Sequence, residues 1–324
     1  MKRRDFTTAL LGGALGVWPL AARAEQANPV VGFLRMTSAA DSAHLAAAFR
    51  EGLKQSGFIE GQNVSIEYRY AENHRDRAPA LAGELIERRV AVIATDQAAH
   101  AAKAATSAIP ILFVLGADPV ADGLVASLNR PGANVTGIVF FSSQLGAKRI
   151  ELLRQLVPAA TTIGVLAYPV SPEDKTERSQ IEAAVAGVGQ KLLIADAVRD
   201  SEIDNAFAKF AEGGVGAVLV GSGPFFRSHK EKIVALARRY ALPTSYSLRE
   251  YVEAGGLMSY GTSITNAYRE AGSYAARILK GEKPGDLPVL QSTKFEFVIN
   301  VKTARSLGLV VPPDLLVAAD DIIE

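Results

Sequence analysis

The chain has 324 residues, of which 48% are hydrophobic and 21% charged, and it contains no cysteine. With 35 basic and 34 acidic residues and no basic block, it lacks the electrostatic footprint of nucleic-acid-binding proteins. No disulfide can form, so stability must come from packed cores, and the length exceeds the usual size of one core, which predicts two domains.

The first 24 residues have the pattern of an export signal. Residues 2–6 (KRRDF) form a basic head, residues 8–20 are apolar, and residues 22–24 (ARA) match the small-x-small pattern that signal peptidase cleaves. The apolar run is too short for a comfortable membrane span. Paired arginines before a weakly hydrophobic run resemble a twin-arginine signal; an ordinary secretory signal and an uncleaved anchor are the alternatives.

Cleavage after Ala24 would release a mature chain that begins at Glu25. Without cysteine no lipid can be attached, so we expect a protein of the Gram-negative periplasm that is not a lipoprotein. Removal of residues 1–24, with four basic residues and one acidic residue, leaves 31 basic and 33 acidic residues and a net charge of −2. We therefore predict no nucleic-acid partner and no direct membrane insertion after signal cleavage.

After the signal, short apolar runs alternate with amphipathic stretches of helical length. The first series of expected strands covers residues 30–34, 64–68, 90–94, 109–115 and 135–140. A helix is expected after the first strand because Leu45, Phe49 and Leu53 lie four residues apart and Gly57 closes the stretch. Further helices are expected around residues 81–86 and over residues 98–105. Another is expected at Asp118-Pro119, because Asp is a preferred N-cap residue and Pro is favoured at the first helical position.

The alternation then starts again. Expected strands cover residues 163–166, 191–194, 217–220 and 257–259, and residues 294–300 read as an exposed or crossing strand. Continuously apolar strands separated by helices predict parallel sheets covered on both faces, in two α/β lobes rather than one barrel. We expect an export signal at residues 1–24, lobe 1 at residues 28–140 plus 262–290, and lobe 2 at residues 141–261 plus 291–324. Several crossings between lobes make a hinge, and the hinged lobes make a clamp.

A search for catalytic, metal and cofactor motifs is negative. The four histidines lie outside metal-ligand spacings, and no glycine-rich loop follows the strand at residues 30–34. Gly221-Ser222-Gly223 lacks the Gly-x-Ser-x-Gly elbow of hydrolases and is typical of a strand-end turn; a hydrolase using Ser222 is the enzyme alternative. We predict a protein that is not an enzyme and binds no metal or cofactor.

The remaining chemistry is that of ligand binding. In parallel sheets ligands lie at the carboxyl ends of strands, where helix N-termini present free N–H groups. Hydroxyls and N–H groups there suit a carboxylate, and Asp96 could bind an ammonium group. Three tyrosines could line the part of the site that holds an aromatic or aliphatic portion of the ligand. The alternative is that the Ser and Thr residues, and Asp118, only cap helices. The predicted ligand-binding residues are Thr37, Ser38, Thr95, Asp96, Gly116, Ala117, Asp118, Ser142, Tyr168, Ser222, Tyr246 and Tyr260.

Several blocks resemble one family. Residues 118–120 (DPV), 124–137 (LVASLNRPGANVTG), 249–261 (REYVEAGGLMSYG) and 294–300 (KFEFVIN) are similar to diagnostic stretches of exported ABC-transporter substrate-binding proteins, in the subgroup related to tryptophan- and tyrosine-binding components. The similarity runs from Val30 to the C-terminus. It implies the periplasmic binding protein type I fold: two Rossmann-like lobes with parallel sheets, joined by a three-crossover hinge, with the ligand in the cleft. Many relatives carry a small residue or glycine before the threonine at the end of the third strand. This chain has Ala94-Thr95-Asp96 there, and we expect Asp96 to alter ligand choice, so the identity of the ligand does not carry over from the resemblance.

The resemblance implies a periplasmic solute-binding component of an ABC importer. Such a protein captures a small organic ligand, amino-acid-like or aromatic, by hinge closure and delivers it to permease subunits in the inner membrane, while an ATPase inside the cell powers transport. A periplasmic sensor that presents its ligand to a receptor or a sensor kinase is the alternative. A ligand-regulated transcription factor of the same fold would need a basic DNA-binding head, where this chain has an export signal.

Overall fold

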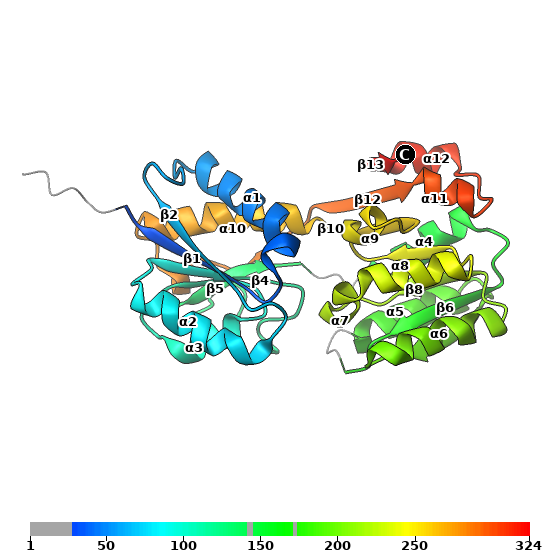
Figure 1. The fold of residues 1–324 in the computed structure, drawn as a ribbon, viewed down its shortest axis with the longest axis horizontal. Coiled ribbons are helices and arrows are strands. Elements are labelled where there is room, and N and C mark those ends of the chain that lie inside the picture. The colour runs from blue at the N-terminus through cyan, green and yellow to red at the C-terminus, as the bar shows by residue number, and fades with distance from the viewer. Residues whose placement is uncertain (1–27, 141–144, 171–173) are drawn as a thin grey trace, which may run out of the picture.

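The computed structural model describes residues 28–140, 145–170 and 174–324, which form two α/β lobes side by side (Figure 1). Each lobe is built on one sheet, six-stranded in lobe 1 and seven-stranded in lobe 2. The predicted fold class is therefore confirmed. The predicted export signal lies outside the described residues. Among the described residues, no helix combines the length and the apolar character that crossing a bilayer requires.

Lobe 1 holds the first sheet, in the order β11-β5-β4-β3-β1-β2, and all of its pairings are parallel. Its strands are β1 (Val30–Arg35), β2 (Ser65–Tyr70), β3 (Val92–Thr95), β4 (Ile111–Leu115), β5 (Val135–Val139) and β11 (Leu290–Gln291). Its helices are α1 (Ala39–Gln55), η1 (Arg75–Arg77), α2 (Ala78–Glu87), α3 (Ala99–Ala105), α10 (Ile264–Leu279) and η3 (Pro284–Asp286). Helices α1 and α10 cover one face, and α2 and α3 cover the other.

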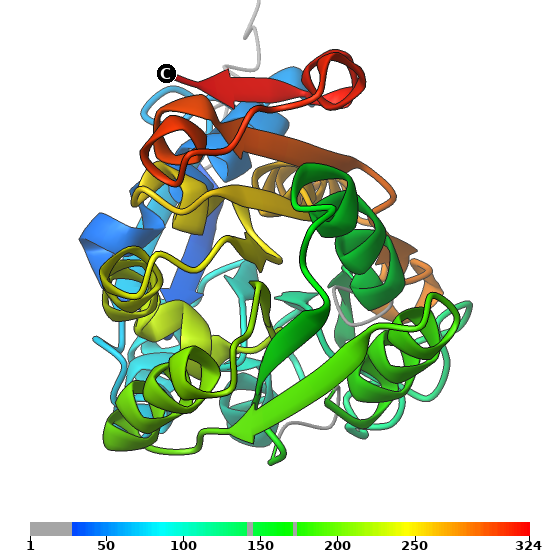
Figure 2. The same cartoon turned by 90° about the vertical axis from the view of Figure 1, so that its right-hand side faces the viewer.

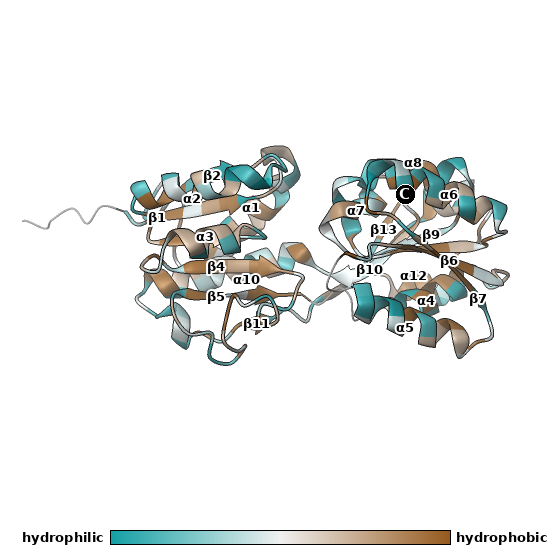
Figure 3. Cartoon of the chain, turned by 90° about the horizontal axis from the view of Figure 1, so that it is seen from below, coloured by the Kyte–Doolittle hydropathy of each residue, from teal (hydrophilic) through white to brown (hydrophobic). Residues whose placement is uncertain are grey.

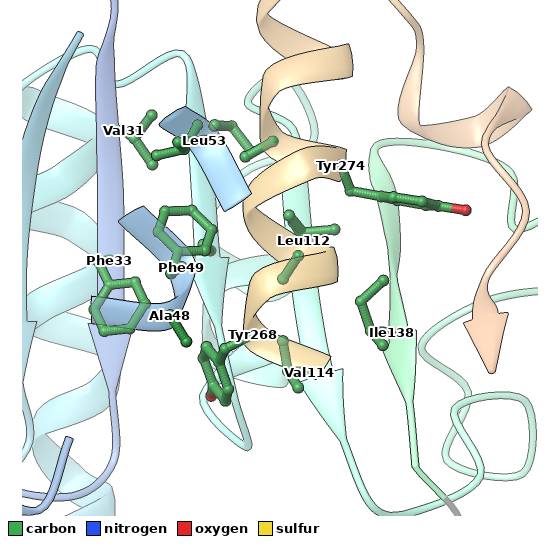
Figure 4. Packing of buried hydrophobic residues seen from close by; sticks show 14 of the residues in the cluster. Val31, Phe33, Ala48, Phe49, Leu53, Leu112, Val114, Ile138, Tyr268 and Tyr274 are labelled. Atoms are coloured by element: carbon green, nitrogen blue, oxygen red, sulfur yellow. The ribbon is translucent and has the colours of Figure 1, made fainter. Parts of the chain in front are cut away.

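Helices α1 and α10 meet at two glycines. A Cβ on Gly272 would overlap the carbonyl oxygen of Phe49 and lie 2.8 Å from the backbone nitrogen of Leu53. A Cβ on Gly52 would likewise overlap the carbonyl oxygen of Arg269. The two backbones therefore touch directly, which seats Phe33, Phe49 and Tyr268 together in the core beneath them (Figure 4).

Lobe 2 holds the second sheet, in the order β13-β12-β10-β9-β8-β6-β7. Its strands are β6 (Thr162–Ala167), β7 (Lys191–Asp196), β8 (Ala217–Val220), β9 (Thr244–Tyr246), β10 (Met258–Thr262), β12 (Phe295–Asn300) and β13 (Asp321–Ile323). The described pairings are parallel except that β10 and β12 run antiparallel. Figure 2 shows the C-terminal strand at one edge of this sheet.

Two layers of helices cover the sheet of lobe 2. One layer comprises α4 (Gly146–Leu156), α5 (Asp174–Ala186), α11 (Val301–Ser306) and α12 (Pro313–Ala318). The other comprises α6 (Asp200–Glu212), α7 (Pro224–Ser228), α8 (Lys230–Arg239) and α9 (Arg249–Glu253). In both lobes the enclosed strands are mostly hydrophobic and the helices carry the hydrophilic surface (Figure 3), as expected of sheets covered on both faces.

The chain passes between the lobes three times. It leaves lobe 1 between β5 and α4, returns between β10 and α10, and leaves again between β11 and β12. Strand β12 runs antiparallel to β10 because, at this third crossing, the chain enters lobe 2 at the end of the sheet where β10 leaves it.

One predicted element is wrong. Asp118-Pro119 does not begin a helix: residues 119–123 form turns, and Gly123 has a φ of +69°. The side chain of Asp118 accepts hydrogen bonds from the backbone N–H groups of Val120 and Ala121, at 2.9 and 3.3 Å. The capping chemistry is thus present, but only one turn follows it.

Candidate ligand-binding site

Two cavities lie between the lobes. The larger has a volume of about 670 Å³ and the smaller about 450 Å³, both within the usual range for small-molecule sites. Met36, Gln97 and Arg227 line both cavities, so the two adjoin. Several positions lining the larger cavity lie one or two residues after a strand, as expected of a ligand site in a parallel sheet. They include Met36, Gln97, Gly116 and Phe140 in lobe 1 and Tyr168, Ser222 and Ser247 in lobe 2.

The larger cavity has an aromatic side chain from each lobe. Phe140 follows β5 and Tyr168 follows β6. The Tyr168 ring stacks on Phe225, with ring centres 5.1 Å apart and planes 18° apart. A Cβ on Gly116 would lie 3.0 Å from the Phe140 ring, so a larger residue there would push against this ring. Apolar residues, among them Leu115, Leu248 and Ile264, complete the wall.

Arg227 joins the two cavities and is held by Glu250. Its Nε and Nη2 atoms donate to the two carboxylate oxygens of Glu250, each at 2.9 Å, a bidentate pair. Burial raises the pKa of Glu250, but Arg227 and His44 outweigh burial and lower that pKa to about 2. Glu250 is therefore ionised at neutral pH, and Arg227 has a fixed orientation beside the cavities.

Two polar contacts, one of them an ion pair, bridge the lobes at the smaller cavity. His44 of α1 lies 3.4 Å from Glu250 of α9, and Lys230 of α8 lies 3.7 Å from Asp41 of α1. All four residues line that cavity. Charged side chains of both lobes thus meet at the smaller cavity, whereas the wall of the larger one is mainly aromatic and apolar, with Arg75, Asp122 and Arg227 among its charged residues.

Asp96 is paired with a buried arginine that the sequence analysis did not select. Its carboxylate lies 3.1 Å from Nη1 of Arg35 and accepts from the backbone N–H groups of Met36 and Ala98, at 3.2 and 3.3 Å. Burial lowers the pKa of Arg35, and Asp96 opposes that shift. The Arg35 guanidinium also lies 4.8 Å from the centre of the Tyr268 ring. Asp96 therefore neutralises Arg35, a pairing that the expectation of an ammonium site at Asp96 did not include.

A second buried ion pair lies behind Ser222. Arg149 of α4 donates through Nη2 to Glu177 of α5, and through Nη1 to the carbonyl oxygen of Val220 at 2.8 Å. Glu177 also accepts from Ser222, from its backbone N–H at 2.7 Å and from its hydroxyl at 3.0 Å. Burial raises the pKa of Glu177 and lowers that of Arg149, and their mutual attraction opposes both shifts. Ser222 thus connects this network to the larger cavity.

The structure brings six of the predicted residues to the cavities. Gly116, Ala117, Tyr168 and Ser222 line the larger cavity, and Thr37 and Asp96 line the smaller one. Ser142 lies outside the described residues. Within the described ranges, no group of three or more histidine and carboxylate side chains could hold a metal ion.

Five predicted residues do not line either cavity. Tyr246 is fully buried in the core of lobe 2, where its ring stacks on Tyr251 with centres 4.7 Å apart. Thr95 is buried, and Tyr260 packs against Phe295 and Phe297. Ser38 caps α1, its hydroxyl accepting from the backbone N–H of Asp41 at 3.2 Å, and Asp118 caps the turn described above. The capping alternative describes Ser38 and, at a turn rather than a helix, Asp118, but not Thr95, Tyr246 or Tyr260, which lie within strands.

Phe140, Arg75 and Arg227 line the larger cavity but were not selected from the sequence. The sequence predicted Phe140 as the last residue of the strand at residues 135–140. Because ligands lie at the carboxyl ends of parallel strands, this position could have indicated that Phe140 lines the site. Arg227 follows Gly223-Pro224, the start of the short helix α7, and its sequence neighbours do not indicate its partner Glu250.

Comparison with known proteins identifies the family. The model of the ABC transporter substrate binding protein family matches residues 36–323. A tyrosine-binding protein of Clostridioides difficile is 26% identical over 263 residues, covering 81% of this chain and 75% of the relative. The crystal structure of the ABC domain from Streptococcus pneumoniae in complex with L-Trp has a TM-score of 0.80 and 25% identity, covering 91% of this chain and 100% of that one.

Two further solved structures are similar over the same length. A conserved domain protein from Vibrio cholerae has a TM-score of 0.80 and 26% identity, covering 91% of this chain and 99% of that one. The ligand-free, open structure of a substrate binding protein with adhesive properties from Clostridium difficile has a TM-score of 0.72 and 25% identity, with the same coverage. This chain belongs to the ABC transporter substrate binding protein family.

Proposed function

We propose that this protein is the solute-binding component of an ABC importer and that it takes an aromatic amino acid into the larger interlobe cavity. The observation that carries the proposal is that cavity: about 670 Å³, at the carboxyl ends of strands from both lobes, with Phe140 on one side and Tyr168 on the other. The tyrosine-binding relative and the L-Trp complex of a similar structure support the ligand class.

The charges around the cavity suit the carboxylate of an amino acid. Arg75 and Arg227 line it, and the two hydrogen bonds of Arg227 to Glu250 involve Nε and Nη2, which leaves Nη1 for a ligand. Phe140 and Tyr168 would contact the aromatic ring, because aromatic pairs gain energy beyond their buried area. The backbone at Gly116 and Ala117 would add N–H donors.

Closure of the lobes would couple binding to transport. A ligand that touches both lobes gains contacts available only in the closed form, and so shifts the population toward it. The contact between His44 and Glu250 and the ion pair between Asp41 and Lys230 also require the lobes to be close. The closed form would dock on permease subunits in the inner membrane, after export under the signal at residues 1–24 to the periplasm.

A thermal-shift panel tests this function. Residues 25–324 are refolded from denaturant to remove ligand carried over from the host, then mixed with aromatic amino acids, aliphatic amino acids, short-chain acids and purines. A ligand that binds only the native state adds about 2.7 kcal/mol of stability at a hundredfold excess over its Kd. We expect a saturable rise in Tm with L-tryptophan or L-tyrosine. A rise only with another class, or with none, would contradict the proposed ligand.

A further inference from the structure

The turn Gly221-Ser222-Gly223 holds Ser222 between the larger cavity and the buried Glu177. A Cβ on Gly221 would lie 2.9 Å from the carbonyl oxygen of Leu166, and Gly223 has a φ of +144°. Both glycines are thus needed for this backbone path. The path aims the N–H and the hydroxyl of Ser222 at the same carboxylate while Ser222 remains on the cavity wall.

The hydrogen bonds of Glu177 fix the direction of the Ser222 hydroxyl. One carboxylate oxygen accepts the backbone N–H of Ser222, and the other accepts the guanidinium of Arg149. Both of those donors are N–H groups that cannot accept, so they favour the ionised carboxylate. An ionised carboxylate can only accept, so the hydroxyl hydrogen of Ser222 must point at Glu177. The oxygen of Ser222 therefore presents only lone pairs to the cavity.

The carboxylates near the cavities are already engaged. Asp96 is paired with Arg35, and Glu250 with Arg227 and His44. Asp122, which lines the larger cavity, is not free either. A cationic group of a ligand would thus compete with these partners at each carboxylate, whereas a neutral acceptor with a fixed lone pair has no such competitor.

We propose that Ser222 accepts a hydrogen bond from the α-amino group of the bound ligand, and that Glu177 and Arg149 are positioning residues that fix its hydroxyl as an acceptor. This inference rests on the proposed binding of an aromatic amino acid in the larger cavity. It also gives the buried ion pair a role, since such a pair is weak evidence for stability by itself.

Calorimetry with two matched ligands tests the inference. L-tryptophan and 3-(indol-3-yl)propanoate differ only in the α-amino group. They are titrated into wild type, Ser222→Ala, Ser222→Thr, which keeps the hydroxyl, and Ser228→Ala as a control. Ser228 lines only the smaller cavity, and its hydroxyl donates to the carbonyl oxygen of Phe225 at 2.8 Å.

We expect Ser222→Ala to weaken L-tryptophan binding about ten- to a hundredfold, the effect of one hydrogen bond to a charged group, and to leave propanoate binding unchanged. Ser222→Thr should keep the preference for L-tryptophan, and Ser228→Ala should match wild type. Propanoate binding by Ser222→Ala also shows that this variant is folded. An equal loss for both ligands, or a wild type that binds them equally, would overturn the role of Ser222. A wild type that binds neither ligand, and does not bind L-tyrosine either, would overturn the proposed function itself.

Discussion

Replacing Gly272 with alanine is expected to lower the free energy of unfolding of lobe 1 by at least about 3 kcal/mol. The added Cβ would overlap the carbonyl oxygen of Phe49, a backbone atom that cannot rotate away, so α10 would have to move from α1. The same two helices hold Phe49 and Tyr268 against the sheet (Figure 4). Urea denaturation followed by circular dichroism measures the change.

Gly83→Ala is the matched control. Gly83 lies inside α2, where a Cβ would meet no atom within 4 Å, so alanine there should raise stability by about 0.5–1 kcal/mol through helix propensity. If Gly272→Ala were as stable as Gly83→Ala, the direct contact between the backbones of α1 and α10 would be refuted.

Removal of the Glu177 carboxylate is expected to cost about 3–5 kcal/mol of stability in lobe 2. Glu177→Ala would leave the guanidinium of Arg149 buried without its counter-charge, and Arg149 is 0% exposed. The backbone N–H of Ser222 would also lose its acceptor. Thermal and urea denaturation of this variant, compared with wild type, measure the loss.

The double variant Arg149→Met/Glu177→Leu separates burial of a lone charge from loss of packing. Replacing both members of a buried ion pair with apolar residues is often neutral for stability, so the double variant should recover most of the loss. A Glu177→Ala protein as stable as wild type would contradict the buried pair. A double variant as unstable as Glu177→Ala would indicate that the loss of stability comes from packing rather than from the buried lone charge.

The alternation of short apolar strands with amphipathic helices along the chain was sufficient to predict most of the fold. The strand at residues 217–220 begins and ends as expected, and the helix carrying Leu45, Phe49 and Leu53 is α1. These elements are long or continuously apolar, so local pattern determines them. The strands β9, β11 and β13 were missed because they have only two or three residues, and their existence depends on neighbours distant in sequence.

The candidate site was only partly predictable, because sequence shows which residue ends a strand but not which way its side chain points. Tyr168 and Tyr246 both lie at strand ends, yet Tyr168 lines the larger cavity and Tyr246 lies in the core. The sequence also does not show which polar and charged side chains contact one another. Asp96 is neutralised by Arg35, 61 positions earlier, and Ser222 is fixed by Glu177, 45 positions earlier, through contacts that only the folded sheets create.

The most direct test of the account uses the fluorescence of the ligand itself. The chain has one tryptophan, Trp18, which lies in the expected signal, so residues 25–324 contain none. Indole emission from a mixture of this protein with L-tryptophan therefore reports the ligand alone. We predict a saturable blue shift as the indole enters the cavity between Phe140 and Tyr168, reversed by excess L-tyrosine and weakened in Tyr168→Ala. An emission spectrum unchanged at saturating refolded protein, together with no rise in Tm with L-tyrosine, would contradict the binding of an aromatic amino acid between the lobes.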